Sequence, residues 1–70
     1  MYKANDTVTY TNQDGLVKAQ LLKPVSKILG FQVWSVKVLE ILKKASFGGN
    51  PKAGKLARVS ERWFVNEAKS

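Results

Sequence analysis

The residues of this chain that could do chemistry are basic side chains gathered around a glycine-rich stretch. Between Ile41 and Ser60 the sequence has no acidic residue, yet it holds five cations and one aromatic residue, Phe47. The chain-breaking pairs Gly48-Gly49 and Asn50-Pro51 lie among them. Cations on a flexible loop suit the phosphates of a nucleic acid or the surface of an acidic protein. The five cations are Lys43, Lys44, Lys52, Lys55 and Arg58.

Three kinds of contact would let this segment bind a nucleic acid. Its cations would contact phosphates and release condensed counterions. An exposed Phe47 could stack on a base, and the backbone at Gly48-Gly49 could come close to a phosphate. Asn and Gln are few and no recognition helix is evident, so we expect binding without specific base readout. The predicted site for binding DNA or RNA comprises Lys43, Lys44, Phe47, Lys52, Lys55 and Arg58.

The same residues are compatible with other functions. The charge could simply keep a small protein soluble, and Phe47 could pack against the edge of the core instead of facing solvent. The alternative function is a protein-interaction adaptor or inhibitor, which docks on an acidic protein through complementary charge or self-associates as a homo-oligomer. A domain this small often leaves apolar surface for such a partner. The candidate apolar residues are Ile28, Leu29, Phe31 and Phe64.

The chain lacks the residues that catalysis and metal binding usually require. It has no Cys and no His, so the common general base, a thiolate nucleophile, disulfides and a zinc site of the usual kind are absent. Neighbouring Ser and Lys residues, as at Ser26-Lys27, occur by chance in a basic chain. The pair Gly48-Gly49 does not match a phosphate-binding motif that continues with Lys and Ser or Thr. We therefore expect a binding protein that is not an enzyme and uses no cofactor or metal.

Length and composition predict one small domain over residues 1–70. The hydrophobic fraction of 44% is enough for a core despite the net charge of +7. No stretch is long and apolar enough to span a membrane, and the first residues have no apolar signal-like segment. The lysines also do not follow one face of an amphipathic helix. We expect no membrane partner and a cytoplasmic location.

Short strands would position the basic loop. The alternating β-branched and aromatic residues of Thr7–Thr11 predict a first strand. Asp14-Gly15 predicts a tight turn in which Gly supplies a positive φ. A second strand, Leu16–Lys23, would bury alternate residues and end at Pro24, which cannot donate to a ladder. Val25–Gly30 would then be a connection packed against the domain.

The segment Phe31–Lys44 fits both a strand and a helix. We favour a strand because the segment is rich in Val, Trp, Phe and Ile, with a bulge near Leu39-Glu40 where the alternation breaks. Its inward-facing residues would be Trp34, Val36 and Val38. A helix over Ser35–Ala45 is the alternative.

The last part of the chain is expected to close the core. A flexible basic loop over about residues 43–56 leads to a short strand, Leu56–Val59. Ser60-Glu61-Arg62 predicts a single turn capped by Ser60. Trp63–Val65 would form a final strand beside the first one. Both tryptophans lie in apolar runs, so we expect Trp34 and Trp63 in the core.

Five short strands in a chain of 70 residues fit a small, strongly bent barrel. The pattern resembles the SH3-like barrels of the Tudor and KOW type. Asn5-Asp6-Thr7-Val8-Thr9-Tyr10 is similar to their opening "GD-x-V" strand, with Asn5 where Gly is usual, and Asp14-Gly15 lies at the first turn. The turn at Ser60-Glu61-Arg62 stands where this class usually has a turn of 3₁₀ helix. The resemblance implies a mainly β protein, a small five-stranded SH3-like barrel with a long basic loop.

Overall fold

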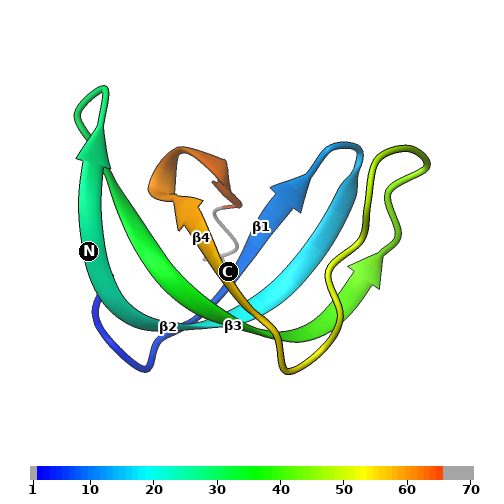
Figure 1. Ribbon diagram of the computed structural model, residues 1–70, viewed down its shortest axis with the longest axis horizontal. Helices are drawn as coiled ribbons and strands as arrows, with labels where there is room; N and C mark the ends of the chain where they lie inside the picture. The colour runs from blue at the N-terminus through cyan, green and yellow to red at the C-terminus, as the bar shows by residue number, and fades with distance from the viewer. Residues whose placement is uncertain (1, 66–70) are drawn as a thin grey trace.

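The computed structural model describes residues 2–65, which form one antiparallel sheet of five strands (Figure 1). The order in the sheet is β4-β3-β2-β1-β5. The predicted mainly β class with five strands is confirmed, but the sheet keeps two edges, β4 and β5, and is not closed into a barrel. The elements are β1 (Thr7–Asn12), β2 (Gly15–Ile28), β3 (Phe31–Lys43), β4 (Leu56–Ser60), the 3₁₀ turn η1 (Glu61–Trp63) and β5 (Phe64–Val65).

Strands β2 and β3 form a long bent hairpin that supports both sides of the sheet. Its half near Gly15 pairs with β1, and its half near Phe31 pairs with β4. Four register shifts interrupt the β2–β3 ladder, and such bulges bend and twist a strand. One of them leaves Leu39 unpaired between Val38 and Glu40, which confirms the predicted bulge. The hairpin therefore curves into the U shape of Figure 1, and the sheet folds over its own inner face.

The core lies on the inner face of this curve. Alternate residues of β2 and β3 are buried, as the period of two requires. The predicted strand over the segment Phe31–Lys44 is confirmed, with Trp34, Val36 and Val38 buried, and the helical alternative is excluded. The Trp34 indole Nε1 donates a hydrogen bond of 2.6 Å to Glu61 Oε2 on η1. The core cluster is Val8, Tyr10, Val17, Ala19, Leu21, Trp34, Val36, Val38 and Val59.

Two predictions about the far half of the hairpin are wrong. Strand β2 does not end at Pro24, and Val25–Gly30 is not a packed connection, because the strand continues to Ile28. Pro24 lies beside a bulge and beyond the last β1 residue paired with β2, where a missing backbone N–H is tolerated. The turn itself is Leu29-Gly30, with φ of 54° and 85°. Positive φ at both central residues is the pattern of a type I′ hairpin.

The first turn also differs from its prediction. Asn12 pairs with Gly15, so the turn residues are Gln13 and Asp14, and the positive φ of 60° belongs to Gln13. Gly15 lies within β2 and is required for space. A Cβ there would come within 2.5 Å of the Lys43 carbonyl oxygen and 2.7 Å of the Ala45 nitrogen.

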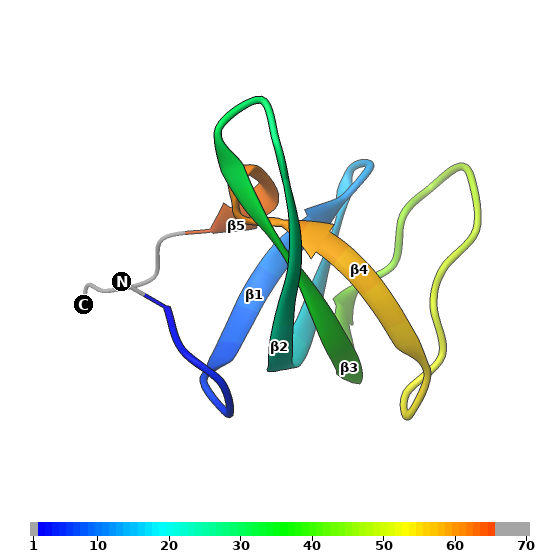
Figure 2. The same cartoon turned by 60° about the vertical axis from the view of Figure 1, so that its left-hand side comes forward.

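Element η1 carries the chain from β4 to β5, as Figure 2 shows. The Ser60 Oγ accepts a hydrogen bond of 3.2 Å from the Arg62 nitrogen, so the predicted turn with its Ser60 cap is confirmed. Strand β5 pairs with β1 as predicted, and Phe64 packs against the core and against the Tyr2 ring, with centroids 4.9 Å apart. Within residues 2–65, no helix is long and apolar enough to cross a membrane.

Candidate binding surface

The basic loop, residues 44–55, begins against the β1–β2 turn. We call its three lysines, together with Lys43 of β3 and Arg58 of β4, the loop cations. The Asp14 carboxylate accepts hydrogen bonds from the Ser46 hydroxyl and, at 2.8 Å, from the Ser46 backbone nitrogen. Asn12 Nδ2 donates to the Gly49 carbonyl oxygen at 3.2 Å. These contacts attach the first half of the loop to a segment more than thirty residues earlier in the chain.

The far end of the loop rejoins β3. The Gly54 nitrogen donates to the Val38 carbonyl oxygen at 2.7 Å, and the Val38 nitrogen donates to the Lys55 carbonyl oxygen at 2.8 Å. The loop thus runs the height of the molecule between its two attachments, as its yellow-green to yellow course shows in Figure 1. Its cations are distributed along this course instead of gathering at one point.

The carboxylate of Asp14 is held in its charged form. The hydrogen bond from the Ser46 hydroxyl, helped by that from the Ser46 nitrogen, lowers the pKa of Asp14 below its ordinary value. The positive charge of Lys43 acts in the same direction. Lys43 pairs with Leu16 at the end of β3, next to the β1–β2 turn.

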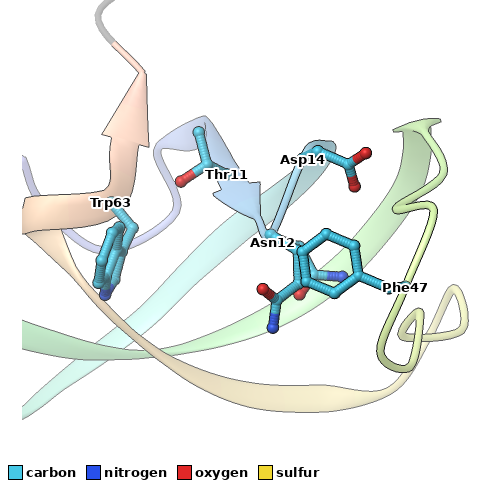
Figure 3. A pocket seen from close by; sticks show the side chains of 6 residues that line it. Thr11, Asn12, Asp14, Phe47 and Trp63 are labelled. Atoms are coloured by element: carbon cyan, nitrogen blue, oxygen red, sulfur yellow. The ribbon is translucent and has the colours of Figure 1, made fainter.

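A hollow of about 540 Å³ lies between the basic loop and η1. Phe47, which is 61% exposed, and Trp63, which is 50% exposed, both line it. Figure 3 shows the two rings on opposite sides of the hollow. The remaining lining residues are Thr11, Gln13 and Asp14.

A second hollow, of about 410 Å³, adjoins the first. Thr11 and Trp63 line both, so Trp63 stands where the two meet. We call the two hollows together the aromatic groove. Its second half draws on β1, the β2–β3 hairpin, β4 and η1, through Tyr10, Ser26, Ile28, Val33, Arg58, Val59 and Ser60.

One cation contacts the central aromatic ring of the groove. The Arg62 guanidinium carbon lies 5.1 Å from the centroid of the Trp63 ring, within the range of a cation–π interaction. Arg62 thus brings positive charge to the ring that separates the two hollows.

The structure separates the six predicted site residues into two places. Phe47 and Arg58 line the aromatic groove, and Lys43 pairs with Leu16 next to the β1–β2 turn. Lys44 follows Lys43 where β3 ends. Lys52 and Lys55 belong to the far end of the loop, where it joins Val38. All five cations are exposed, and the exposure of Phe47 excludes its packing into the core edge.

Sequence reasoning placed Trp63 in the core, and this prediction is wrong. Trp34 is buried as expected, but Trp63 lies in η1 and is half exposed, because the capped turn directs Phe64 to the core instead. The signal in the sequence was the charged pair Glu61-Arg62 directly before Trp63. Other groove residues missed were the polar side chains of Thr11, Asn12, Gln13 and Ser26.

Three of the acidic side chains accept hydrogen bonds from neutral donors. Asp6 Oδ2 accepts from the Lys3 backbone nitrogen at 3.0 Å, Asp14 accepts from Ser46, and Glu61 accepts from the Trp34 indole. None of these hydrogen bonds uses a charged side chain of Lys or Arg. These three acids are therefore bound to the protein's own neutral groups, while the loop cations are exposed.

In the described part of the chain, no group of three or more acidic, His or Cys side chains could hold a metal ion. No family model, curated protein or solved structure matches this chain.

Proposed function

We propose that this protein is a small β module that binds nucleic acid without reading its sequence, through the basic loop and the aromatic groove. We also propose that its sheet is an open variant of the SH3-like arrangement. The strand order β4-β3-β2-β1-β5 and the 3₁₀ turn before β5 support this assignment.

The exposure of all five loop cations is the observation that carries the nucleic-acid proposal. No acidic residue interrupts their segment, and the acids nearby in space are bound to neutral donors. Such cations attract phosphates, and counterion release then makes binding favourable at low salt. We expect little discrimination between bases because the Asn12 amide nitrogen is already bonded to Gly49, and the described residues include no recognition helix that could enter a groove of the nucleic acid.

The test is a fluorescence-anisotropy titration with random-sequence oligonucleotides at about 50 and 200 mM salt. If four loop cations contact phosphates of a single strand, affinity should fall about 50-fold between these salt concentrations. Absence of binding at the lower concentration would refute the proposal.

Two variants with equal net charge locate the site. In the first, the five loop cations Lys43, Lys44, Lys52, Lys55 and Arg58 are changed to Gln. In the second, five lysines elsewhere, Lys3, Lys18, Lys23, Lys27 and Lys37, are changed to Gln. Each lowers the net charge from +7 to +2. We expect the first variant to lose most of the affinity and the second to keep more of it. Equal losses would mean that overall charge, and not the loop, drives binding.

A second candidate function, docking on a protein partner, is favoured by the tip of the β2–β3 hairpin. Ile28, Leu29 and Phe31 are 58%, 80% and 43% exposed there, whereas Phe64, also a candidate from the sequence, packs on the core. No acidic residue occurs between Gly15 and Leu39, so an acidic protein is the charge-complementary partner, whereas a second copy would have to be held by the exposed apolar side chains.

The docking proposal is tested by changing the three tip residues to Ser. The matched control changes Leu39, Leu42 and Leu56, which are 39%, 47% and 68% exposed outside the tip, to Ser. Sedimentation velocity over a range of protein concentrations should show self-association in the wild type and in the control but not in the tip variant. A wild type that stays monomeric throughout excludes a second copy as the occupant and leaves an acidic protein.

A further inference from the structure

The geometry of the aromatic groove points to single-stranded nucleic acid as its ligand, with one unpaired base entering the first hollow between Phe47 and Trp63. This inference rests on the proposed nucleic-acid function. It adds the kind of strand that is bound, the part of the ligand that is held, and two side chains that hold it.

Both aromatic rings are presented to solvent by segments that are held in place. Trp63 belongs to η1, which is capped by Ser60 and continues directly into β5. Phe47 follows Ser46, which is bonded to Asp14, and precedes Gly49, which is bonded to Asn12. The rings therefore lie on opposite sides of the hollow before any ligand arrives (Figure 3), and little ordering is needed when a base enters.

A duplex could not use this hollow. Its bases are stacked on one another and offer only their edges and the phosphates. The flat face of a base becomes available when the base is unpaired, and stacking of that face on an aromatic ring is tolerant of sequence. Two exposed aromatic side chains on either side of one hollow are therefore suited to a single strand and add nothing for a duplex.

Positive charge lies where the phosphates of such a strand would pass. Arg58 lines the second hollow, and Lys43 pairs with Leu16 next to the β1–β2 turn, whose Asp14 lines the first. Arg62 lies against the Trp63 ring between them. A strand crossing the groove past Trp63 would meet a cation on each side of the stacked base.

Among residues 2–65, Asp14 is the one carboxylate that lines the first hollow. Its oxygens accept two hydrogen bonds from Ser46, and Lys43 partly offsets its charge. The repulsion that a bare carboxylate would exert on a phosphate is therefore reduced. The side chains left to contact the base are those of Thr11 and Gln13, together with the Asn12 oxygen.

The experiment compares three labelled probes of equal length at about 50 mM salt: oligothymidylate, a random-sequence duplex, and an abasic single strand that has phosphates but no bases. We expect the oligothymidylate to bind most tightly. Phe47→Ala and Trp63→Ala should each weaken its binding about 5- to 150-fold, the range measured for loss of one base stack. The same variants should leave binding of the duplex and of the abasic strand unchanged.

Two controls separate stacking from a structural effect. Leu56→Ala removes an exposed apolar side chain outside the groove and should change no affinity. Trp63→Phe keeps an aromatic face and should restore most of the binding lost in Trp63→Ala. Quenching of tryptophan fluorescence by oligothymidylate should occur in the wild type and disappear in Trp63→Phe, because Trp34 is buried.

The possible outcomes distinguish the inference from the function on which it rests. Preference for oligothymidylate over the abasic strand, lost in Phe47→Ala and Trp63→Ala, supports the inference. Equal binding of all three probes, unaffected by the aromatic variants, overturns the inference and leaves phosphate binding by the loop intact. If no probe binds at low salt, both the inference and the proposed function are overturned.

Discussion

Replacing Gly15 by Ala should destabilise the protein and displace the start of the basic loop. The added Cβ would lie 2.5 Å from the Lys43 carbonyl oxygen and 2.7 Å from the Ala45 nitrogen, well short of the 3.4 Å at which ordinary contact begins. Both neighbours are backbone atoms at the end of β3, so no side-chain rotation can relieve the clash. The strands must separate locally, and residues 43–45 must move with them.

The expected loss lies at the upper end of the range for overpacking, about 3 kcal/mol in the free energy of unfolding. The whole free energy of unfolding of a domain of this size is roughly 3 to 10 kcal/mol, so the substitution removes a large share of the protein's stability. At 4 to 8 °C per kcal/mol, the melting temperature should fall by about 12 to 24 °C.

Urea unfolding followed by circular dichroism measures this loss. The matched control is Gly49→Ala, whose Cβ would meet nothing within 4 Å and whose φ is not in the left-handed region. Gly49→Ala should be neutral, or stabilising by about 0.4 to 1 kcal/mol through the unfolded chain. If the two variants unfold at the same urea concentration, the close approach of β3 to Gly15 is not as tight as described.

Three further changes test other contacts. Leu29→Asn should raise the free energy of unfolding in urea by about 1 kcal/mol, because Asn adopts a positive φ more readily than Leu. A variant that unfolds at a lower urea concentration than the wild type would show instead that the Leu29 side chain stabilises the hairpin. Glu61→Ala should lower the free energy of unfolding in urea by about 2 kcal/mol, since it removes the charged acceptor of the Trp34 indole. If the NMR resonance of the Trp34 indole proton does not shift in this variant, the hydrogen bond to Glu61 is contradicted. The lowered pKa of Asp14 contributes stability that is present above its ordinary value of 3.8 and is lost as pH falls through the lower value of the folded state. Asp14→Asn should therefore flatten the decline of unfolding free energy with pH below about pH 4, and an equally steep decline would refute the linkage.

The central strands could be predicted because their side chains follow the pleat. Alternation identified the buried faces of β2 and β3, and the break in alternation located the bulge at Leu39. The predicted strand end at Pro24 was wrong because proline usually ends a strand by lacking a backbone N–H. Here Pro24 lies beside a bulge, where the missing N–H costs no ladder hydrogen bond. Gly15 was assigned to a turn for its conformational freedom, although its role depends on β3, which is distant in the sequence.

Two residues of the aromatic groove, Phe47 and Arg58, could be predicted as site residues. The glycine-rich surroundings of Phe47 indicate an exposed ring, and the acid-free segment around Arg58 indicates a free cation. Trp63 could not be identified as part of the groove because composition alone does not say which residue of the pair Trp63-Phe64 turns inward. The joining of the loop to the β1–β2 turn through Asp14 and Ser46 depends on contacts between distant segments, which no local pattern reveals.

The pairing of β5 with β1 has a consequence for the order of folding. Strands β1 to β4 pair in sequence order, each with its predecessor, so these hairpins can form while the rest of the chain is still being synthesised. The β1–β5 pair joins Tyr10 to Phe64 and must close the longest loop, so it can form only after the whole sheet has emerged. Trp63 lies directly before β5 and takes its place in the same step. The aromatic groove is thus completed last, and a nascent chain acquires its binding surface only when folding finishes.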